Sequence, residues 1–320
     1  AERVYILVGS FHATTFTELF DGTASLPWEA FIPKNGAFPV KGHSVKSALF
    51  SIPDCQKIIK KAAATRLSSV YHTSWLPETE EKYQIEFFIL KDETSLMIDT
   101  SGMALHKRGY RPQSIPAPLR ETLAAAMVKL SRPREEVLLH DPFCGSATIP
   151  IEAAMLMTNT APGLSRRFAA EAFAFLPESV WMAAREEANT LRRSDTNFEA
   201  YASDIDPDAV KNAKLCAKNA GMANHIRIYE ADALSITTGG RRGTVVCNPP
   251  YGERLGTIKE AEALYRKMGH HFTSLDAWQI YVLTSHEGFE RLYGRKADKV
   301  RKLYNGMLPV SYTHLRAHET

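Results

Sequence analysis

The sequence predicts an α/β protein, in which a Rossmann-like domain with a mostly parallel sheet follows a small α+β domain. Two observations predict this. Beyond residue 120, strand-like apolar runs alternate with helical stretches, and this rhythm is typical of a parallel sheet covered on both faces. Before residue 110, short strands and helices are mixed. The length of 320 residues is enough for two domains that each bury a core.

The first domain is expected to cover residues 1–109. YILVGSF is strand-like, and TTFTELFDG predicts a short helix. SIPDCQKIIKKAAATRL predicts a second helix, because Ser51 lies three residues before Asp54 as in a capping box. QIEFFILKD and SLMIDTSG are rich in β-formers and flank a polar turn, so they predict a hairpin.

Residues 110–120 contain RPQSIPAPLR, whose prolines and basic residues indicate a linker. The second domain is expected over residues 121–309. Its predicted strands are EVLLHDPFC, EAYASDID, HIRIYEAD, GTVVCNPPY and WQIYVLTS. Its predicted helices are ETLAAAMVKLS, GSATIPIEAAMLM, PDAVKNAKLCAKNAG and AEALYRKMGHHF.

Charge is distributed unevenly along the chain, although the net charge is only +3. Two stretches without acidic residues carry several cations, which are Lys57, Lys60, Lys61 and Arg66 in the first and Lys107, Arg108 and Arg111 in the second. Such clusters bind phosphate groups in nucleic-acid-binding proteins, but they are equally common as solvated faces. Composition alone leaves both interpretations open.

Four scattered cysteines form no C-x-x-C pair, which argues against a zinc site or a disulfide framework and suits a reducing cytoplasm. No apolar run is long enough to span a bilayer, and no signal peptide is visible. The chain starts at Ala1 within a strand-like run, so we expect its natural beginning to be missing. VSYTHLRAHET resembles a translated sequencing adapter, so residues 310–320 are expected to be a non-native tail.

Polar residues follow three of the predicted strands at the edge where open α/β sheets bind ligands. Asp141 and Gly145 come first, without the glycine spacing of a dinucleotide or phosphate-binding loop. Asp204 follows the next strand, where an acid accepts hydrogen bonds from both hydroxyls of a ribose, whereas Asp206 is expected to cap the next helix. Asp232 is placed to accept from the amine of an adenine.

The fourth strand ends in CNPPY. The oxygens of Asn248 and Pro249 can accept from both N–H groups of an exocyclic base amine, which favours a tetrahedral nitrogen with its lone pair directed outward. Pro250 helps to hold these acceptors in place, and Tyr251 offers a face on which an extruded base can stack. A nucleoside cofactor without phosphates beside such a loop predicts methyl transfer from S-adenosylmethionine.

Several motifs together resemble the THUMP-domain RNA methyltransferases, in particular the bacterial RlmL group, which methylates guanine N2 in 23S ribosomal RNA. The motifs are DPFCGSATIPIEAA, SDIDP, CNPPYGERLG, LTSHE and KLYNG. In the front half, ATTFTELFDGTASLPWE, KSALFSIPDCQKIIKKA and IDTSGMALHKRGYR resemble segments of the THUMP domain, which binds RNA. The resemblance covers nearly the whole chain. It implies a class I methyltransferase fold, S-adenosylmethionine as cofactor and structured RNA, above all 23S ribosomal RNA, as partner.

The resemblance also implies roles for individual positions. The cofactor-binding residues would be Pro118, Leu119, Thr122, Asp141, Phe143, Gly145, Asp204 and Asp232. The catalytic loop would be Asn248, Pro249, Pro250 and Tyr251. The RNA-binding residues would be Lys57, Lys60, Lys61, Arg66, Lys107, Arg108 and Arg111. Glu253 and Arg254 would orient the loop or the RNA, or form a surface ion pair. No metal is expected, because no cluster has ligand spacing.

Three departures from the family pattern stand out. Ala147 replaces a glycine, so its methyl group could crowd the cofactor. The family has a further stretch, including a small ferredoxin-like domain, before the position of Ala1. After KLYNG the family continues into a last antiparallel strand, which the tail replaces. We therefore expect that strand to be missing and a gap to remain between WQIYVLTS and KVRKLYNG.

Four alternatives remain open. The loop suits any planar exocyclic amine, so adenine N6 of DNA or RNA is a second target, and transfer RNA is a second substrate. Cys247 adjoins the loop and suggests a cysteine-dependent pyrimidine methylase, although a residue at this position is more often packed inward. A non-catalytic RNA-binding protein with a degenerate methyltransferase fold is the alternative from another class.

Overall fold

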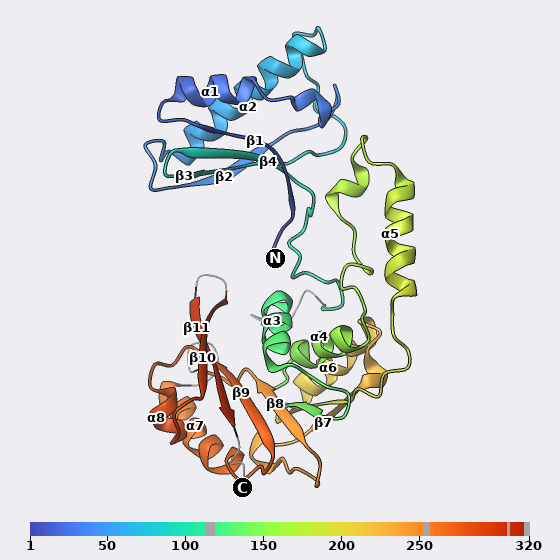
Figure 1. The fold of residues 1–320 in the computed structure, drawn as a ribbon, viewed down its shortest axis with the longest axis vertical. Coiled ribbons are helices and arrows are strands. Elements are labelled where there is room, and N and C mark those ends of the chain that lie inside the picture. The colour runs from blue at the N-terminus through green and yellow to red at the C-terminus, as the bar shows by residue number, and fades with distance from the viewer. Residues whose placement is uncertain (113–118, 252–256, 306–307, 317–320) are drawn as a thin grey trace. The chain divides into compact units, whose positions relative to one another are not determined.

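A computed structural model describes residues 1–112, 119–251, 257–305 and 308–316 (Figure 1). The chain forms two compact units. The first unit comprises residues 1–105 and 167–185, and the second comprises residues 106–166 and 186–320. Among the described residues, no helix combines the length and the apolar character that a membrane crossing requires.

The first unit is a four-stranded sheet in the order β1-β4-β3-β2. Its elements are β1 (Tyr5–His12), α1 (Phe16–Ala24), the 3-10 helix η1 (Trp28–Ala30), β2 (Val40–Val45), α2 (Ile52–Val70), β3 (Ile85–Leu90), β4 (Glu93–Asp99) and the 3-10 helix η2 (Ala169–Ala172). The predicted hairpin is confirmed, because β3 and β4 pair antiparallel. The sequence reading missed β2, which pairs parallel to β3.

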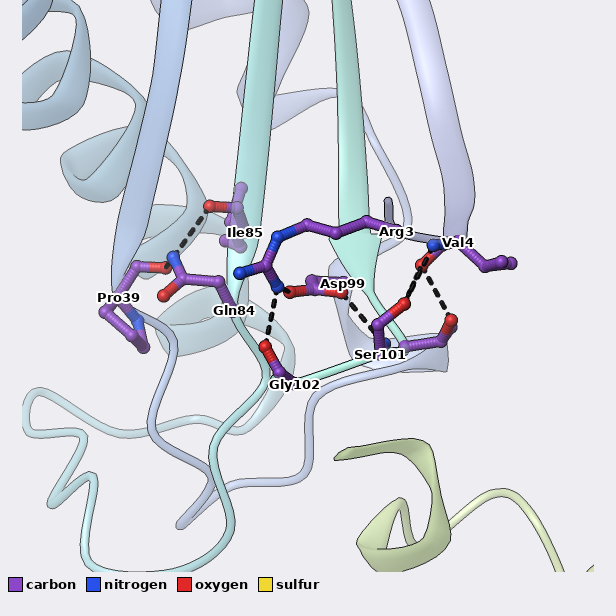
Figure 2. Close-up of polar contacts among 9 residues, drawn as sticks. Arg3, Val4, Pro39, Gln84, Ile85, Asp99, Ser101 and Gly102 are labelled. Carbon is purple, nitrogen blue, oxygen red and sulfur yellow. Dashed lines mark hydrogen bonds and ion pairs between the residues drawn. The ribbon is translucent and has the colours of Figure 1, made fainter. Parts of the chain in front are cut away.

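Polar contacts fasten the start of β1 to the end of β4 (Figure 2). Arg3 pairs with the buried Asp99 and donates to the carbonyl oxygen of Gly102 at 2.6 Å. The amide of Val4 donates to Oγ of Ser101 at 2.8 Å. These contacts satisfy backbone groups where the regular sheet pairing ends, and they fix the direction in which the chain leaves the sheet.

Residues 167–185 belong to the first unit by their contacts, although they lie far along the chain. The ring of Phe173 stacks on Tyr83 with the centroids 4.7 Å apart. The amide of Ala174 donates to the Tyr83 hydroxyl at 3.1 Å, and the amide of Ala170 donates to the Thr100 carbonyl at 3.1 Å. Aromatic residues of FAAEAFAF thus extend the core of the first unit.

The second unit is a seven-stranded sheet in the order β10-β11-β9-β8-β5-β6-β7. Its strands are β5 (Leu138–Asp141), β6 (Ala200–Asp204), β7 (Ile226–Glu230), β8 (Gly243–Cys247), β9 (Trp278–Thr284), β10 (Lys299–Asn305) and β11 (Leu308–Arg316). Its helices are α3 (Glu121–Ser131), α4 (Thr148–Met157), α6 (Pro207–Asn219), α7 (Ile258–Phe272) and α8 (Phe289–Tyr293), with α5 (Glu178–Thr190) shared between the units. The 3-10 helices η3 (Ala223–His225) and η4 (Ala233–Ser235) flank β7. Strands β5 to β9 pair parallel, as a class I methyltransferase fold requires.

Neighbouring residues of the central strands enter two different cores. Val246 joins the core that contains residues of α3, α4 and α6, whereas Val245 joins the core formed with α7 and α8. Tyr281 and Ile280 of β9 divide in the same way. The alternation places helices on both faces of the sheet.

The prediction that the last antiparallel strand is missing is wrong. Residues 308–316 form β11, which lies between β10 and β9 and pairs antiparallel with both. Val310, Tyr312 and Leu315 are buried, and the Tyr312 hydroxyl donates to the Met127 carbonyl at 2.9 Å. The expected gap is therefore filled, because alternating side chains of this segment fit both cores of the unit.

Replacing Tyr312 with alanine tests the contribution of β11. Tyr312→Ala should lower the free energy of unfolding by about 3–5 kcal/mol, because it removes a buried ring and leaves the Met127 carbonyl without this donor. Tyr304→Ala, on β10 and 60% exposed, is the control and should cost less than about 1 kcal/mol. Urea unfolding followed by circular dichroism gives both values. Equal, small losses would contradict a structural role for β11.

Candidate active site

Four polar strand ends meet at one edge of the sheet. Because β8, β5, β6 and β7 are adjacent and parallel, Asn248, Asp141, Asp204 and Asp232 leave the sheet in the same direction. The structure thus brings together the residues that the sequence assigned to cofactor and catalysis.

The loop after β5 is joined to the end of β6. The amide of Gly145 donates to Oδ2 of Asp204 at 2.9 Å, and the amide of Cys144 donates to the Ser203 carbonyl at 3.0 Å. Gly145 has a φ of +51°, and a Cβ atom placed there would meet nothing within 4 Å. A glycine with open space above it lets a ligand approach the backbone closely. Gly145 and the Asp204 carboxylate, together called the glycine cradle, therefore leave space that fits a nucleoside cofactor.

Asp204 is held by two backbone donors and remains partly exposed. Besides Gly145, the amide of Asp206 donates to it, at 3.1 Å on Oδ1. A carboxylate fixed in this way keeps lone pairs directed at a ligand. Asp206 itself caps α6 by accepting from the Asp208 amide at 2.9 Å, as its sequence position predicts.

Asp141 lies beneath this edge and is only 2% exposed. Burial raises the pKa of its carboxyl well above the ordinary value, and the neighbouring charge of Asp204 raises it further. The amide of Phe143, which donates to Oδ1 at 3.1 Å, acts in the opposite direction. Asp232 is exposed and caps η4 by accepting from the Leu234 amide at 2.9 Å.

A partly buried arginine connects the residue before α3 with the start of α4. Arg111 donates to the Leu119 carbonyl at 3.1 Å and to Oγ1 of Thr148 at 2.6 Å. Leu119 is buried and Thr122, in the first turn of α3, is half-buried, and Arg111 links the Leu119 carbonyl to the start of α4. Pro118 lies outside the described residues.

Ala147 adopts the left-handed conformation, with a φ of +56°, at the N-cap of α4. An L-residue with a Cβ pays roughly 1–2 kcal/mol in this region, which explains why glycine suits the position. Its side chain is fully buried in the core formed with α3, α4 and α6. The methyl group therefore packs into this core, and whether it crowds the cofactor stays a prediction.

The catalytic loop follows the fully buried Cys247. Asn248 is half-buried, and the Tyr251 hydroxyl donates to its Oδ1. The carbonyl of Pro250 accepts from the hydroxyl of Tyr265 at 3.1 Å. Sequence reasoning missed Tyr265, because in α7 it has the spacing of an ordinary core residue. Glu253 and Arg254 lie outside the described residues.

Cys247 does not suit the chemistry of a cysteine-dependent pyrimidine methylase. Burial raises the pKa of its thiol well above the ordinary value, and the nearby Asp141 raises it further. Because the thiolate is the nucleophile in such enzymes, an inaccessible and protonated thiol argues against this alternative.

The four cations of α2 differ in their surroundings. Lys60 and Arg66 form ion pairs with glutamates, at 2.6 Å to Glu78 and 3.0 Å to Glu29. Lys57 is exposed, with an aspartate 3.7 Å away, and Lys61 is exposed as well. Lys57 and Lys61 therefore present their charges to solvent, where a phosphate can reach them.

In the second basic cluster, two arginines are paired inside the protein and one lysine is exposed. Arg108 is 9% exposed and pairs with Glu152 at 3.1 Å, and Arg111 lies 3.4 Å from Glu121. Both guanidinium groups form ion pairs with glutamates inside the second unit, so the geometry does not fit the predicted RNA contacts of these two arginines. Lys107 is exposed and remains available to solvent.

Comparisons with known proteins agree with this geometry. Residues 108–314 match the family described as the RMKL-like methyltransferase domain, and residues 13–99 match the THUMP domain. The chain is 46% identical to the "Putative RNA methyltransferase YpsC" of Bacillus subtilis over 98% of this chain and 82% of that protein. It is 31% identical to the ribosomal RNA large subunit methyltransferase K/L of Shewanella baltica over 99% of this chain. The chain spans about half (46%) of that relative's length.

A related solved structure identifies the cofactor. A methyltransferase complexed with SAH superimposes with a TM-score of 0.93 and is 40% identical, covering 100% of this chain and 85% of that one. SAH, S-adenosylhomocysteine, is what S-adenosylmethionine becomes after methyl transfer. S-adenosylmethionine is therefore the cofactor, and the open glycine cradle and fixed carboxylate fit it.

Asp204 and Asp206 offer a matched pair of variants. Asp204→Asn should weaken S-adenosylmethionine binding about tenfold to a hundredfold, because it removes a charged acceptor for the ribose hydroxyls. Asp206→Ala should leave that affinity unchanged and lower the free energy of unfolding by about 1 kcal/mol through the lost cap. Isothermal titration calorimetry measures the affinities. An unchanged dissociation constant in Asp204→Asn would rule out the ribose contact.

Proposed function

We propose that this chain, which belongs to the RMKL-like methyltransferase family, transfers a methyl group to the exocyclic N2 amine of a guanosine in 23S ribosomal RNA. At the coarser level it is an S-adenosylmethionine-dependent RNA methyltransferase. The observation that carries the proposal is the rigid loop from Asn248 to Tyr251, which lies at the same sheet edge as Asp204 and Gly145.

In the proposed reaction, the chain orients the amine rather than exchanging protons with it. S-adenosylmethionine supplies an electrophilic methyl group when bound. Asn248 Oδ1 and the Pro249 carbonyl accept from the two N–H groups of the amine, which concentrates the lone pair on nitrogen. The nitrogen bonds to the methyl carbon as the carbon–sulfur bond breaks, and the amine then releases one proton to solvent. Tyr251 exchanges its hydrogen bond with Asn248 for a stacking contact with the base.

The cofactor contacts follow the strand order. Asp204 accepts from the ribose hydroxyls, and Asp232 accepts from the adenine amine. Asp141, Phe143 and Gly145 are proposed to flank the methionine part, together with Leu119 and Thr122.

RNA as the substrate is supported by the THUMP match over residues 13–99 and by relatives named as RNA methyltransferases. Within the first unit, Lys57 and Lys61 of α2 are proposed to contact phosphates, with Lys60 and Arg66 held in ion pairs beside them. The ribosomal target is proposed from the K/L relatives, of which this chain spans about half. Four buried free cysteines are consistent with the cytoplasm as the place of action.

Transcripts that contain inosine in place of guanosine separate the candidate bases, because inosine lacks only the N2 amine. Guanosine-containing 23S fragments should accept methyl groups, and inosine-containing fragments should accept none. If the inosine transcript accepts as many methyl groups as the guanosine transcript, adenine N6 is the target instead. Transfer RNA tested in parallel decides between the two RNA substrates.

The Asn248→Ala variant tests the catalytic loop. It should reduce methyl transfer below detection while the affinity for S-adenosylmethionine stays nearly intact, because only the acceptor for the amine is removed. Asn189→Ala, on the exposed side of α5, is the matched control and should keep full turnover. Transfer of radiolabelled methyl groups to RNA measures the effect. Wild-type turnover in Asn248→Ala would refute the role of this loop.

A further inference from the structure

A buried tyrosine of α7 contacts the backbone of the catalytic loop. Tyr265 has no exposed surface and packs edge-on against Phe289, with the ring centroids 5.1 Å apart. Its hydroxyl donates to the Pro250 carbonyl at 3.1 Å and lies 3.2 Å from Oγ1 of Thr284, the last residue of β9. Packing thus fixes the ring of Tyr265, and its hydroxyl is directed at the Pro250 carbonyl of the loop.

The hydroxyls form a chain with a defined direction. The amide of His286 donates to Oγ1 of Thr284 at 3.1 Å. Because the hydroxyl hydrogen of Tyr265 goes to Pro250, its oxygen accepts from the hydroxyl of Thr284. Thr284 is 1% exposed, so these bonds lie in an environment where each strengthens the next.

The composition of the loop limits its own backbone donors. Pro249 and Pro250 have fixed φ angles and no N–H groups, so only Asn248 and Tyr251 of this loop can donate from the backbone. The remaining freedom is rotation about ψ, which turns the Pro250 carbonyl and the peptide plane that leads to Tyr251. A donor held on that carbonyl removes this freedom.

We infer that Tyr265, supported by Thr284, is a positioning residue for the catalytic loop. It fixes the peptide between Pro250 and Tyr251 and thereby the place from which the Tyr251 ring meets the base. Tyr265 itself touches neither base nor cofactor. The inference rests on the proposed function of the loop and adds the element of α7 that holds it in place.

The Tyr265→Phe variant removes one oxygen atom and keeps the buried ring. Its kcat should fall about tenfold to a hundredfold, because small misplacements of a reacting geometry have effects of this size, and the KM for S-adenosylmethionine should not change. Tyr293→Phe, a buried tyrosine of the same core on α8, is the control and should keep the wild-type kcat. A wild-type kcat in Tyr265→Phe overturns the inference.

The double variant Tyr265→Phe/Thr284→Val tests whether the hydroxyls act in series. If Thr284 acts only through Tyr265, the double variant should have the same kcat as Tyr265→Phe alone. If the kcat of the double variant falls by the product of the two single-variant losses, the hydroxyls act independently, and the supporting role of Thr284 is overturned.

Hydrogen–deuterium exchange of the Tyr251 amide gives a readout that needs no substrate. The amide should exchange faster in Tyr265→Phe than in wild type, and at the wild-type rate in Tyr293→Phe. If the wild-type protein methylates no RNA, the proposed function fails. The exchange rate of the Tyr251 amide then still decides whether Tyr265 positions the loop. Equal exchange in Tyr265→Phe and wild type overturns it.

Discussion

The parallel pairing of β8, β5, β6 and β7 is the constraint on which the site depends. It directs four polar strand ends to one edge, and reversing any one of these strands would send its polar end to the opposite edge. The hydrogen bond from the Gly145 amide to Asp204 then joins two of these ends into a single cradle. Asn248 follows β8, which is adjacent to β5, and on the proposed function it accepts from the base amine beside the cofactor.

A second constraint follows from the two prolines. They fix two φ angles of the loop and remove two of its backbone donors. Helix α7 supplies a donor from outside the loop with Tyr265, whose ring lies in the core and whose hydroxyl donates to the Pro250 carbonyl. The catalytic loop and the core on this face of the sheet are therefore parts of one rigid arrangement.

Much of the fold and the site follows from local sequence. The alternation of apolar runs with helices predicted the parallel sheet, and the position of Asp206 after a strand predicted its role as a helix cap, which is confirmed. The assignment of Asp204 to the ribose stays a prediction. Two expectations failed for different reasons. Arg108 was expected to contact RNA because nothing in its local sequence reveals its buried partner Glu152, which is 44 residues away. The last strand was expected to be missing because VSYTHLRAHET resembles a translated adapter, whereas residues 308–316 pair with β9.

The most direct measurement is mass-spectrometric mapping of modified nucleosides in ribosomal and transfer RNA from a strain in which the gene is deleted. The account predicts the loss of N2-methylguanosine at a defined position of 23S ribosomal RNA, and its return when the wild-type gene is restored. Unchanged N2-methylguanosine, or the loss of N6-methyladenosine in its place, would contradict the account.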